Sequence, residues 1–193
     1  MILFNNYVIF TLVYRNGIWF KILNMGGLCK LVKLLQAIYS GVKSCVRPNT
    51  SNNVYSAYVD SFMGVKQGEP LSPFWVICFI NDMYTFIKDG SFDVVNIDDL
   101  QLLVLLFADD TVLFSYSKEG RQFQLNHLYT YCSNWGINTA KTVVMVFKKH
   151  NRRTENVELL YNNQVLKVVK VILCASEHIC SIVRYCFRSL KQL

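Results

Sequence analysis

Apolar residues recur every three or four positions in three segments of the chain, which is the spacing of one face of an α-helix. The first segment is at 28–39, where Lys30 and Lys33 lie between the apolar positions. The last segment is followed by Gly136, a residue that suits the end of a helix. Its apolar positions are Leu125, Leu128, Cys132 and Trp135. The pattern predicts amphipathic helices that each pack one face against a core.

The middle helical segment begins at the end of the loop GVKQGEPLSP (64–73) and extends to Lys88. Ser72 is a good N-cap residue, and Pro73 suits the first helical position. Lys88 in the last turn and Gly90 beyond it are typical of a helix end. The core face of this helix is predicted to consist of Phe74, Ile77, Cys78, Met83, Tyr84 and Ile87.

Extended segments alternate with these helices. VKSCVR (42–47) and VYSAYVDSFM (54–63) flank the turn residues PNTSNN, which predicts a β-hairpin. LLVLLF (102–107) is short and rich in branched residues, so it predicts a buried strand, and TVLF (111–114) returns beside it. AKTVVMVFKK (140–149) predicts a further strand. The order of helix, hairpin, helix, hairpin, helix and strand is typical of an α+β fold with an antiparallel sheet.

Composition and charge narrow the choice of partner and compartment. The 193 residues suit one domain, and 52% of them are hydrophobic, which is enough for a sizeable core. The 20 Lys and Arg residues exceed the 13 Asp and Glu residues, and the net charge of +7 favours a polyanionic partner such as nucleic acid. No apolar stretch reaches the roughly 18 residues of a membrane span, so we expect a soluble, intracellular protein that is not secreted.

The seven cysteines lack paired spacing. Four of them, Cys29, Cys45, Cys78 and Cys132, lie among apolar residues, which predicts reduced thiols in the core. The other three lie near His178 but lack the tight spacing of a structural zinc motif, so no zinc site is predicted there.

Two adjacent aspartates, Asp109 and Asp110, interrupt the apolar stretch LLFADDTVLF. Two carboxylates a few Å apart repel each other by about 4 kcal/mol at an effective dielectric constant of about 20. At the tip of a hairpin they can point out of the sheet and bind Mg²⁺ or Mn²⁺, which prefer oxygen ligands. An ordinary surface turn explains them equally well, because Asp is common in turns. Spacing alone leaves both interpretations open.

The aspartate pair belongs to a wider resemblance. LLFADDTVLF resembles the F/Y-A-D-D box of reverse transcriptases, and GVKQGEPLSPFWVICFINDM resembles the motif that precedes this box. YRNGIWFKILNMG (14–26) and WGINTAKTVVMVF (135–147) are similar to non-long-terminal-repeat retrotransposons of animals. The resemblance extends from about Val13 to Lys149. It implies an α+β fold with a polymerase palm-like antiparallel sheet, helices packed on one face, part of the fingers and no recognisable thumb.

The resemblance also implies a site and its ligands. Asp109 and Asp110 would hold two Mg²⁺ or Mn²⁺ ions for the transfer of deoxynucleotides to a DNA primer on an RNA template. Lys141 would lie near the leaving pyrophosphate, although by itself it is equally an ordinary solvated lysine before a strand. The residues beside the template and the incoming nucleotide would be Lys66, Gln67, Gly68 and Ser72. Without the resemblance, those four residues would be interpreted as a plain loop and a helix cap.

Three features depart from the family pattern. Active members carry an upstream aspartate where this chain has Thr11, whose hydroxyl is a weak, neutral ligand. The segment after Trp135 is about two residues short, which predicts a shifted strand register. No primer-grip signature follows residue 165. These departures predict a partial reverse transcriptase domain at 1–150 and a divergent tail at 151–193 without an assigned domain.

The expected protein is therefore a truncated, degenerate copy of a reverse transcriptase that binds Mg²⁺ or Mn²⁺ weakly and is inactive by itself. Two alternatives remain at this level. One is a non-catalytic remnant that still binds nucleic acid through its basic surface, and the other is a relic without a selected function.

Overall fold

The computed structural model describes residues 2–5, 13–47, 55–66, 68–89, 93–97, 99–107, 110–137, 141–149 and 158–173. For some strand residues, among them Asn5, Asp110 and Lys141, the description covers the backbone alone. The chain divides into two compact units. We call Met1–Tyr7 with Asp82–Leu193 the sheet unit, and Val8–Asn81 the helical unit.

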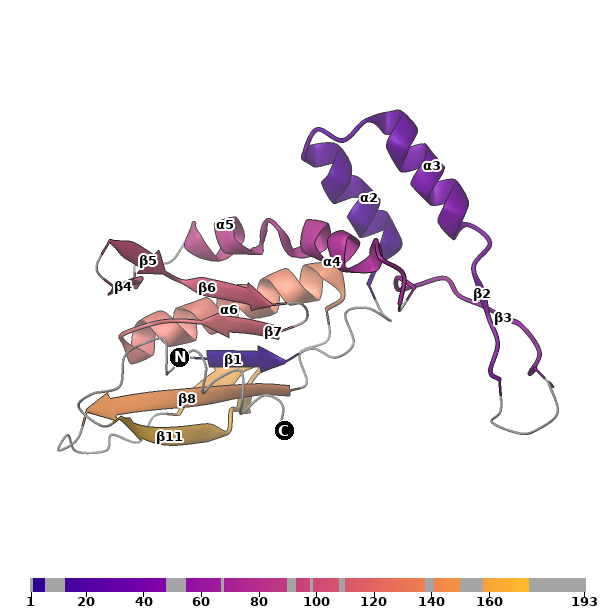
Figure 1. Cartoon of the computed structure of the whole chain (residues 1–193). Coiled ribbons are helices and arrows are strands. Elements are labelled where there is room, and N and C mark those ends of the chain that lie inside the picture. Colours follow the sequence, from indigo (N-terminus) through magenta and orange to yellow (C-terminus); the bar gives the residue numbers. More distant parts are fainter. Residues whose placement is uncertain are drawn as a thin grey trace. The chain divides into compact units, whose positions relative to one another are not determined.

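Five strands form the main sheet of the sheet unit (Figure 1). In spatial order they are β11 (Val168–Leu173), β8 (Lys141–Lys149), β1 (Ile2–Asn5), β7 (Asp110–Leu113) and β6 (Val104–Phe107). The pairs β8–β1, β1–β7 and β7–β6 are antiparallel, as predicted, but the edge strand β11 is parallel to β8. The predicted strands at 102–107, 111–114 and 140–149 are confirmed, with ends that differ by at most two residues.

Two short ribbons complete the strands described in this unit. β4 (Val95–Ile97) pairs with β5 (Leu100–Leu102), and β9 (Leu160–Tyr161) pairs with β10 (Gln164–Val165). Asn162 and Asn163 connect β9 to β10 with positive φ angles of 49° and 60°, which asparagine tolerates better than most residues. No helix or strand was predicted in the tail at 151–193, because the Asn-Asn turn signal was overlooked.

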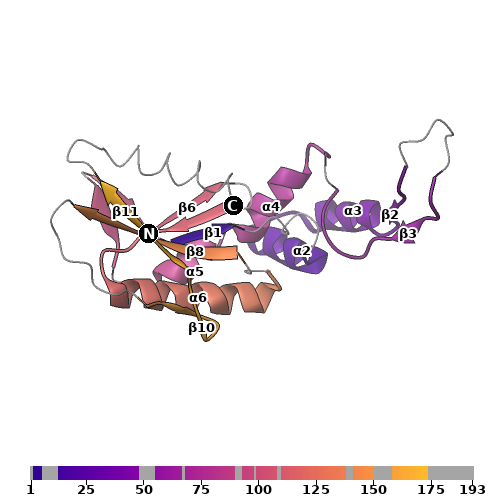
Figure 2. The same ribbon diagram turned by 90° about the horizontal axis from the view of Figure 1, so that it is seen from below.

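The predicted last helix is confirmed as α6 (Lys118–Trp135), which packs with α5 (Met83–Lys88) on one side of the main sheet (Figure 2). Ser117 caps α6, because its Oγ accepts a hydrogen bond of 2.9 Å from the Gly120 N–H. Gly136 ends the helix with a φ of 66°, in the left-handed region that glycine adopts without strain. The predicted core positions Leu125, Leu128 and Cys132 are buried, and Trp135 is partly buried.

The core of the sheet unit contains side chains from α5 and α6, from strands of the main sheet, and from Leu103, which directly precedes β6. Burying one such aliphatic side chain stabilises a fold by about 1.5–3 kcal/mol relative to leaving it exposed. The most deeply buried members include Met83, Ile87, Leu103, Leu113, Leu125, Leu128 and Val144. This core fixes the sheet that carries the aspartate pair.

The helical unit contains α2 (Arg15–Asn24), α3 (Cys29–Tyr39) and α4 (Ser72–Ile80). Its core includes Trp19, whose ring centroid lies 5.8 Å from that of Tyr39 and 6.2 Å from that of Trp75. The predicted helix at 28–39 is confirmed as α3, whereas α2 was not predicted.

The predicted hairpin at 42–63 is confirmed, but its ladder is short. Among the described residues, two of each strand form the ladder, in β2 (Lys43–Ser44) and β3 (Val59–Asp60), and the predicted turn at 48–53 lies outside the described residues. The ladder is extended by a hydrogen bond of 2.9 Å from the Ser61 N–H to the Val42 carbonyl. The hairpin projects from the end of α3 (Figure 1).

The predicted middle helix is interrupted. It consists of α4 and α5, with Asn81 and Asp82 between them. Ser72 is not the N-cap residue but the first residue of α4, and its Oγ donates a hydrogen bond of 2.5 Å to the carbonyl of Lys66. The hydroxyl therefore closes the preceding turn instead of capping the helix.

The predicted core face of this segment is only partly correct. Cys78, Met83 and Ile87 are buried, but Phe74, Ile77 and Tyr84 are exposed. Because almost every residue of α4 is apolar, its periodicity cannot select which face is buried. The buried positions of α4 are Ser72, Trp75, Val76, Cys78, Phe79 and Ile80.

Two expectations from composition can be compared with the structure. Cys78 and Cys132 are buried free thiols, as predicted, whereas Cys29 is exposed and Cys45 is partly exposed. His178 and the three cysteines near it lie outside the described residues. In the described part of the chain, no helix is both long enough and apolar enough to cross a membrane.

Candidate functional site

The aspartate pair lies at the connection between β6 and β7. Phe107 pairs with Asp110 in the antiparallel ladder, so two residues, Ala108 and Asp109, connect the strands. A two-residue connection is the commonest form of a β-hairpin. The predicted hairpin is confirmed, but Asp110 is the first residue of β7 and not a turn residue. Asp109 itself lies outside the described residues.

The register of the main sheet places two predicted site residues in one row. Asn5 of β1 pairs with Asp110 of β7 on one side and with Lys141 of β8 on the other. Directly paired positions in antiparallel strands share a face of the sheet, with Cβ atoms about 4.5–5.5 Å apart. We call Asp110, Asn5 and Lys141 the sheet row. It contains one carboxylate, one neutral amide and one ammonium group.

The other predicted site residues surround a tight turn in the helical unit. The Glu69 N–H donates to the carbonyl of Lys66 at 3.3 Å, and the Ser72 N–H donates to the carbonyl of Glu69 at 3.1 Å. Gly68 has a φ of +85°, and a Cβ added there would meet nothing within 4 Å. The glycine is therefore required by the backbone conformation and not by a close neighbour. Gln67 lies outside the described residues.

Tyr39 links α3 to this turn. Its hydroxyl donates a hydrogen bond of 2.9 Å to the carboxylate of Glu69, and the Lys66 ammonium lies 5.5 Å from the centre of its ring. Burial raises the pKa of the Tyr39 phenol, and the hydrogen bond to Glu69 raises it further. The phenol therefore stays protonated at neutral pH and holds the turn, while the Lys66 side chain remains exposed.

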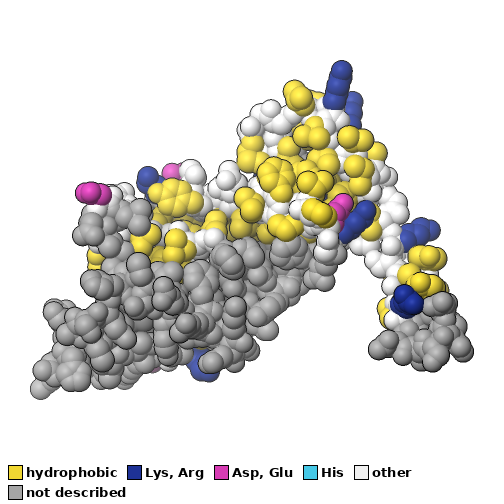
Figure 3. Space-filling view, in the orientation of Figure 1, with side chains coloured by type: hydrophobic (Ala, Val, Ile, Leu, Met, Phe, Trp, Pro, Cys, Tyr) yellow, Lys and Arg dark blue, Asp and Glu magenta, His cyan; other side chains and the backbone are white. Residues whose placement is uncertain are grey.

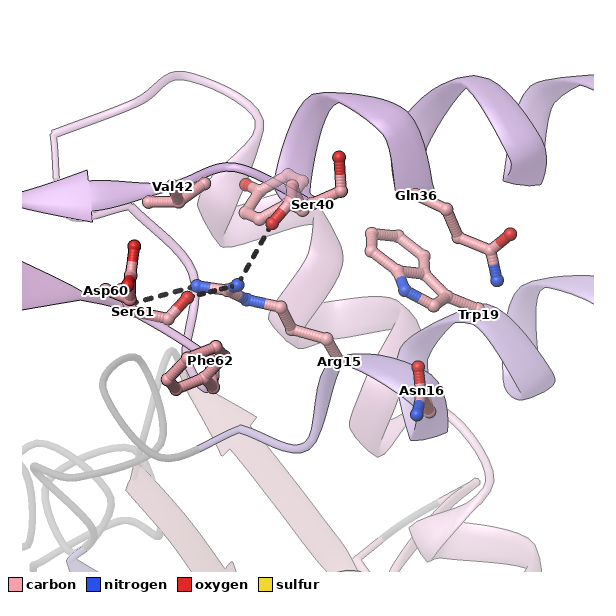
Figure 4. A pocket seen from close by; sticks show the side chains of 10 residues that line it. Arg15, Asn16, Trp19, Gln36, Ser40, Val42, Asp60, Ser61 and Phe62 are labelled. Atoms are coloured by element: carbon pink, nitrogen blue, oxygen red, sulfur yellow. Dashed lines mark hydrogen bonds between the residues drawn. The ribbon is translucent and has the colours of Figure 1, made fainter.

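The base of the hairpin is held by Arg15, which the sequence did not single out. The guanidinium donates to the carbonyls of Gly64 at 2.7 Å, Ser61 at 2.6 Å, Met63 at 3.0 Å and Tyr39 at 3.2 Å. Figure 4 shows it between the end of α3 and the strand that leaves the hairpin. Burial lowers the pKa of Arg15, but an arginine remains charged at any physiological pH. Arg15 therefore fixes the position of the segment that leads into the turn.

A family model described as "Reverse transcriptase (RNA-dependent DNA polymerase)" matches residues 27–168, which is more than half of the chain. The chain belongs to the reverse transcriptase family. No protein with a curated description matches the chain significantly. Domains of this family act on a nucleic acid template and primer with nucleotide substrates, and they generally use divalent metal ions.

The matched part of this reverse transcriptase domain contains every site residue predicted from the sequence. The structure brings Asp110 and Lys141 together through Asn5, and it separately groups Lys66, Gly68 and Ser72 around one turn. These two groups belong to different compact units.

The sheet row can be tested as a metal site by the chemistry of its groups. Carboxylate and amide oxygens are ligands that Mg²⁺ and Mn²⁺ accept, whereas the ammonium of Lys141 repels a cation and suits a phosphate. Among the described residues there is no group of three His, Cys, Asp or Glu side chains that could hold a metal ion. Of the three residues of the row, Asp110 alone carries a carboxylate.

Sequence reasoning missed Asn5. The upstream aspartate of the family was assigned to the position of Thr11, which lies outside the described residues, so that assignment stays a prediction. In the structure β7 lies between β6 and β1, and β1 ends at Asn5. The available signal was a short apolar run, Ile2 to Phe4, ending in a polar residue, which is the same pattern as the strand that leads into Asp109.

Proposed function

We propose that this chain is a degenerate reverse transcriptase domain of the non-long-terminal-repeat type, which binds nucleic acid but does not extend a primer. The observation that carries the proposal is the sheet row, in which the neutral Asn5 pairs with Asp110. The retrotransposon type is supported by the segments at 14–26 and 135–147, and the division into a domain at 1–150 and a tail at 151–193 is part of the same proposal.

In the family reaction, two bound divalent ions activate the primer hydroxyl and stabilise the leaving oxygen. We assign Asp109 and Asp110 to ion binding and Lys141 to the phosphate that leaves. Asn5 would lie where a further carboxylate could hold both ions, and an amide supplies no negative charge there. Misplacing a reacting group by about 1 Å can cost on the order of 100-fold in rate. One missing charge is therefore enough to remove detectable synthesis.

The remaining assignments concern the substrates. Lys66 would contact a phosphate of the RNA template or of the incoming deoxynucleotide, and Gln67 would form hydrogen bonds beside it. Gly68 and Ser72 would shape and brace the turn that presents them, as the positive φ of Gly68 and the Ser72–Lys66 hydrogen bond suggest.

The first test is metal binding, measured by calorimetric titration with Mn²⁺. Asn5→Asp is expected to bind Mn²⁺ about 30-fold more tightly than the parent, because a unit charge 4 Å from a divalent ion contributes about 2 kcal/mol even at the dielectric constant of water. Asn24→Asp, which adds the same charge at the end of α2, serves as the matched control and is expected to match the parent. Equal affinities for both variants would contradict the assignment of Asn5.

The second test is labelled-primer extension on an RNA template with Mg²⁺. We expect no product from the parent chain. Asp110→Asn serves as the control for contaminating polymerase. Extension by the parent that disappears in Asp110→Asn would overturn the proposal that the domain is degenerate.

A non-catalytic role in nucleic acid binding is favoured by the distribution of charge. The helical unit contains seven basic residues and only two acidic ones, Asp60 and Glu69. If the basic residues of the hairpin and turn contact phosphates, neutralising Lys43, Arg47 and Lys66 together should reduce the slope of log K against log salt by about 2, at about 0.7 per contact for a single strand. An unchanged slope would place the phosphate contacts elsewhere.

A further inference from the structure

A pocket of about 340 Å³ lies in the helical unit, where α2, the end of α3 and the end of β3 meet (Figure 4). Its volume is at the lower end of the range of about 300–1,000 Å³ that is typical of small-molecule sites. Its walls include the aromatic rings of Trp19 and Phe62, the amide groups of Asn16 and Gln36, and the carboxylate of Asp60. None of the site residues predicted from the sequence lines this pocket.

The pocket has a rigid charged wall that is not available to a ligand. Arg15 lines it, but its donors are already used by the carbonyls at the base of the hairpin and by the Ser61 hydroxyl. An anion in the pocket would therefore find no free guanidinium N–H and would face the carboxylate of Asp60. A free phosphate is a poor fit for this chemistry.

A flat group with apolar faces and a polar edge fits better. Phe62 is 83% exposed, which is a high exposure for a phenylalanine side chain that lines a pocket. Gln36 makes no side-chain hydrogen bond to another described residue, and its amide can both donate and accept a hydrogen bond. Aromatic rings stack on nucleobases, and amides pair with their edges.

The hairpin next to the pocket supplies groups that suit the rest of a nucleic acid strand. Lys43 lies 3.7 Å from Asp60 and is largely exposed, so it balances the carboxylate and presents a cation beside the pocket. Further along the hairpin, Tyr58 is exposed and Arg47 lies 5.9 Å from the ring centre of Tyr55. Cations interleaved with exposed aromatic rings are the pattern of a surface that binds single strands.

We propose that this pocket receives one unpaired nucleobase of a single-stranded nucleic acid, with the base stacked on Phe62 and its edge facing Gln36. The strand's phosphates would lie along the basic hairpin. This inference rests on the proposed function, because it names where a strand would contact the helical unit.

The test uses the purified full chain and a ten-nucleotide oligouridylate that carries one 2-aminopurine. Binding of the parent is expected to quench the fluorescence of the 2-aminopurine, because the base stacks on an aromatic ring. Phe62→Ala is expected to abolish the quenching and to weaken binding by about 5-fold or more, the usual effect of losing one base–aromatic stack. Gln36→Ala is expected to weaken binding less and to keep the quenching.

Phe74→Ala is the matched control, because Phe74 is also an exposed phenylalanine of the helical unit but does not line the pocket. It is expected to leave affinity and quenching unchanged. Since Phe62 is so exposed, its truncation should also leave the thermal melting curve unchanged, which excludes unfolding as the cause of the loss.

Two results would overturn the inference. If the parent binds the oligonucleotide with a normal salt dependence, but Phe62→Ala binds it equally well, the pocket does not receive a base, and the proposed function is unaffected. If the parent does not bind the oligonucleotide at all, both this inference and the nucleic-acid-binding part of the proposed function are wrong.

Discussion

Replacing Arg15 with lysine tests whether the helical unit depends on one side chain at the base of its hairpin. Arg15 donates five hydrogen bonds, to the carbonyls of Gly64, Ser61, Met63 and Tyr39 and to the Ser61 hydroxyl. These acceptors are in three places: the end of α3, the end of β3 and the segment that leads into the turn. A planar guanidinium reaches them simultaneously from fixed positions, whereas a lysine ammonium has three donors on a single atom.

The expected loss follows from this geometry. Lysine loses at least two of the five hydrogen bonds, and a hydrogen bond from a charged donor is typically worth about 1.5–3 kcal/mol. Because Arg15 is only partly buried, water can replace part of each lost bond, so the lower end of that range applies. We expect Arg15→Lys to lower the free energy of unfolding by about 2–3 kcal/mol. That is a large part of the roughly 5–15 kcal/mol that stabilises a typical domain.

Urea denaturation followed by tryptophan fluorescence measures this loss, because Trp19 and Trp75 both lie in the core of the helical unit. Arg47→Lys makes the same chemical change on the exposed hairpin and should alter the free energy of unfolding by no more than about 0.5 kcal/mol. If Arg15→Lys were no more destabilising than Arg47→Lys, the hydrogen bonds of Arg15 could not be what holds the hairpin base.

Two further predictions concern the start of α6, where the Asp93 carboxylate accepts hydrogen bonds from Ser117 N–H at 2.8 Å and from two serine hydroxyls. Burial raises the pKa of Asp93, but these hydrogen bonds outweigh it and lower the pKa below its ordinary value of 3.8. The stabilisation that the ionised Asp93 carboxylate gives is therefore complete above about pH 4 and is lost as the pH falls through the folded-state pKa. Urea denaturation should show that Asp93→Asn lowers the free energy of unfolding by about 2 kcal/mol at pH 7 and by much less near pH 2. An equal difference at both pH values would contradict this. Gly120→Ala should lower the melting temperature, because the added methyl group would overlap the Asp93 carboxylate, whereas Gly41→Ala has open space around it and should not; equal melting temperatures would show that the carboxylate can move aside.

The sequence predicted the helices whose apolar stripe is regular and missed the one whose stripe is broken. α3 and α6 have clear amphipathic spacing and capping or terminating residues, and both were found. α2 was missed because Lys21 occupies a buried position, where its ammonium donates a hydrogen bond of 2.5 Å to the Phe79 carbonyl and lies 5.0 Å from the Phe79 ring. In the sequence, Lys21 interrupts the apolar spacing, and the carbonyl that accepts its hydrogen bond is 58 residues away, so local spacing could not indicate that Lys21 is buried.

The candidate site could be predicted only as far as local chemistry allows. The Asp109–Asp110 pair and the loop before α4 were predicted because each is a contiguous sequence motif. The sheet row was not predicted, because it forms only when β1 inserts between β7 and β8. In the sequence, β7 and β8 are about 30 residues apart, and both are more than 100 residues from β1. Such non-local pairing is fixed by the whole core and not by the propensity of any one segment.

The two parts of the proposed function differ in how much they depend on single residues. Binding to a nucleic acid strand is the sum of many phosphate contacts, so the loss of one basic residue weakens it by a modest factor. Two-metal transfer depends on a few ligands in fixed positions, and no neighbouring group can replace a missing carboxylate. Under the proposed function, the neutral Asn5 beside Asp110 would therefore remove synthesis, while the basic residues of the helical unit would continue to bind. For this reason, a chain of this composition is expected to retain salt-dependent binding of single strands after it has lost polymerisation.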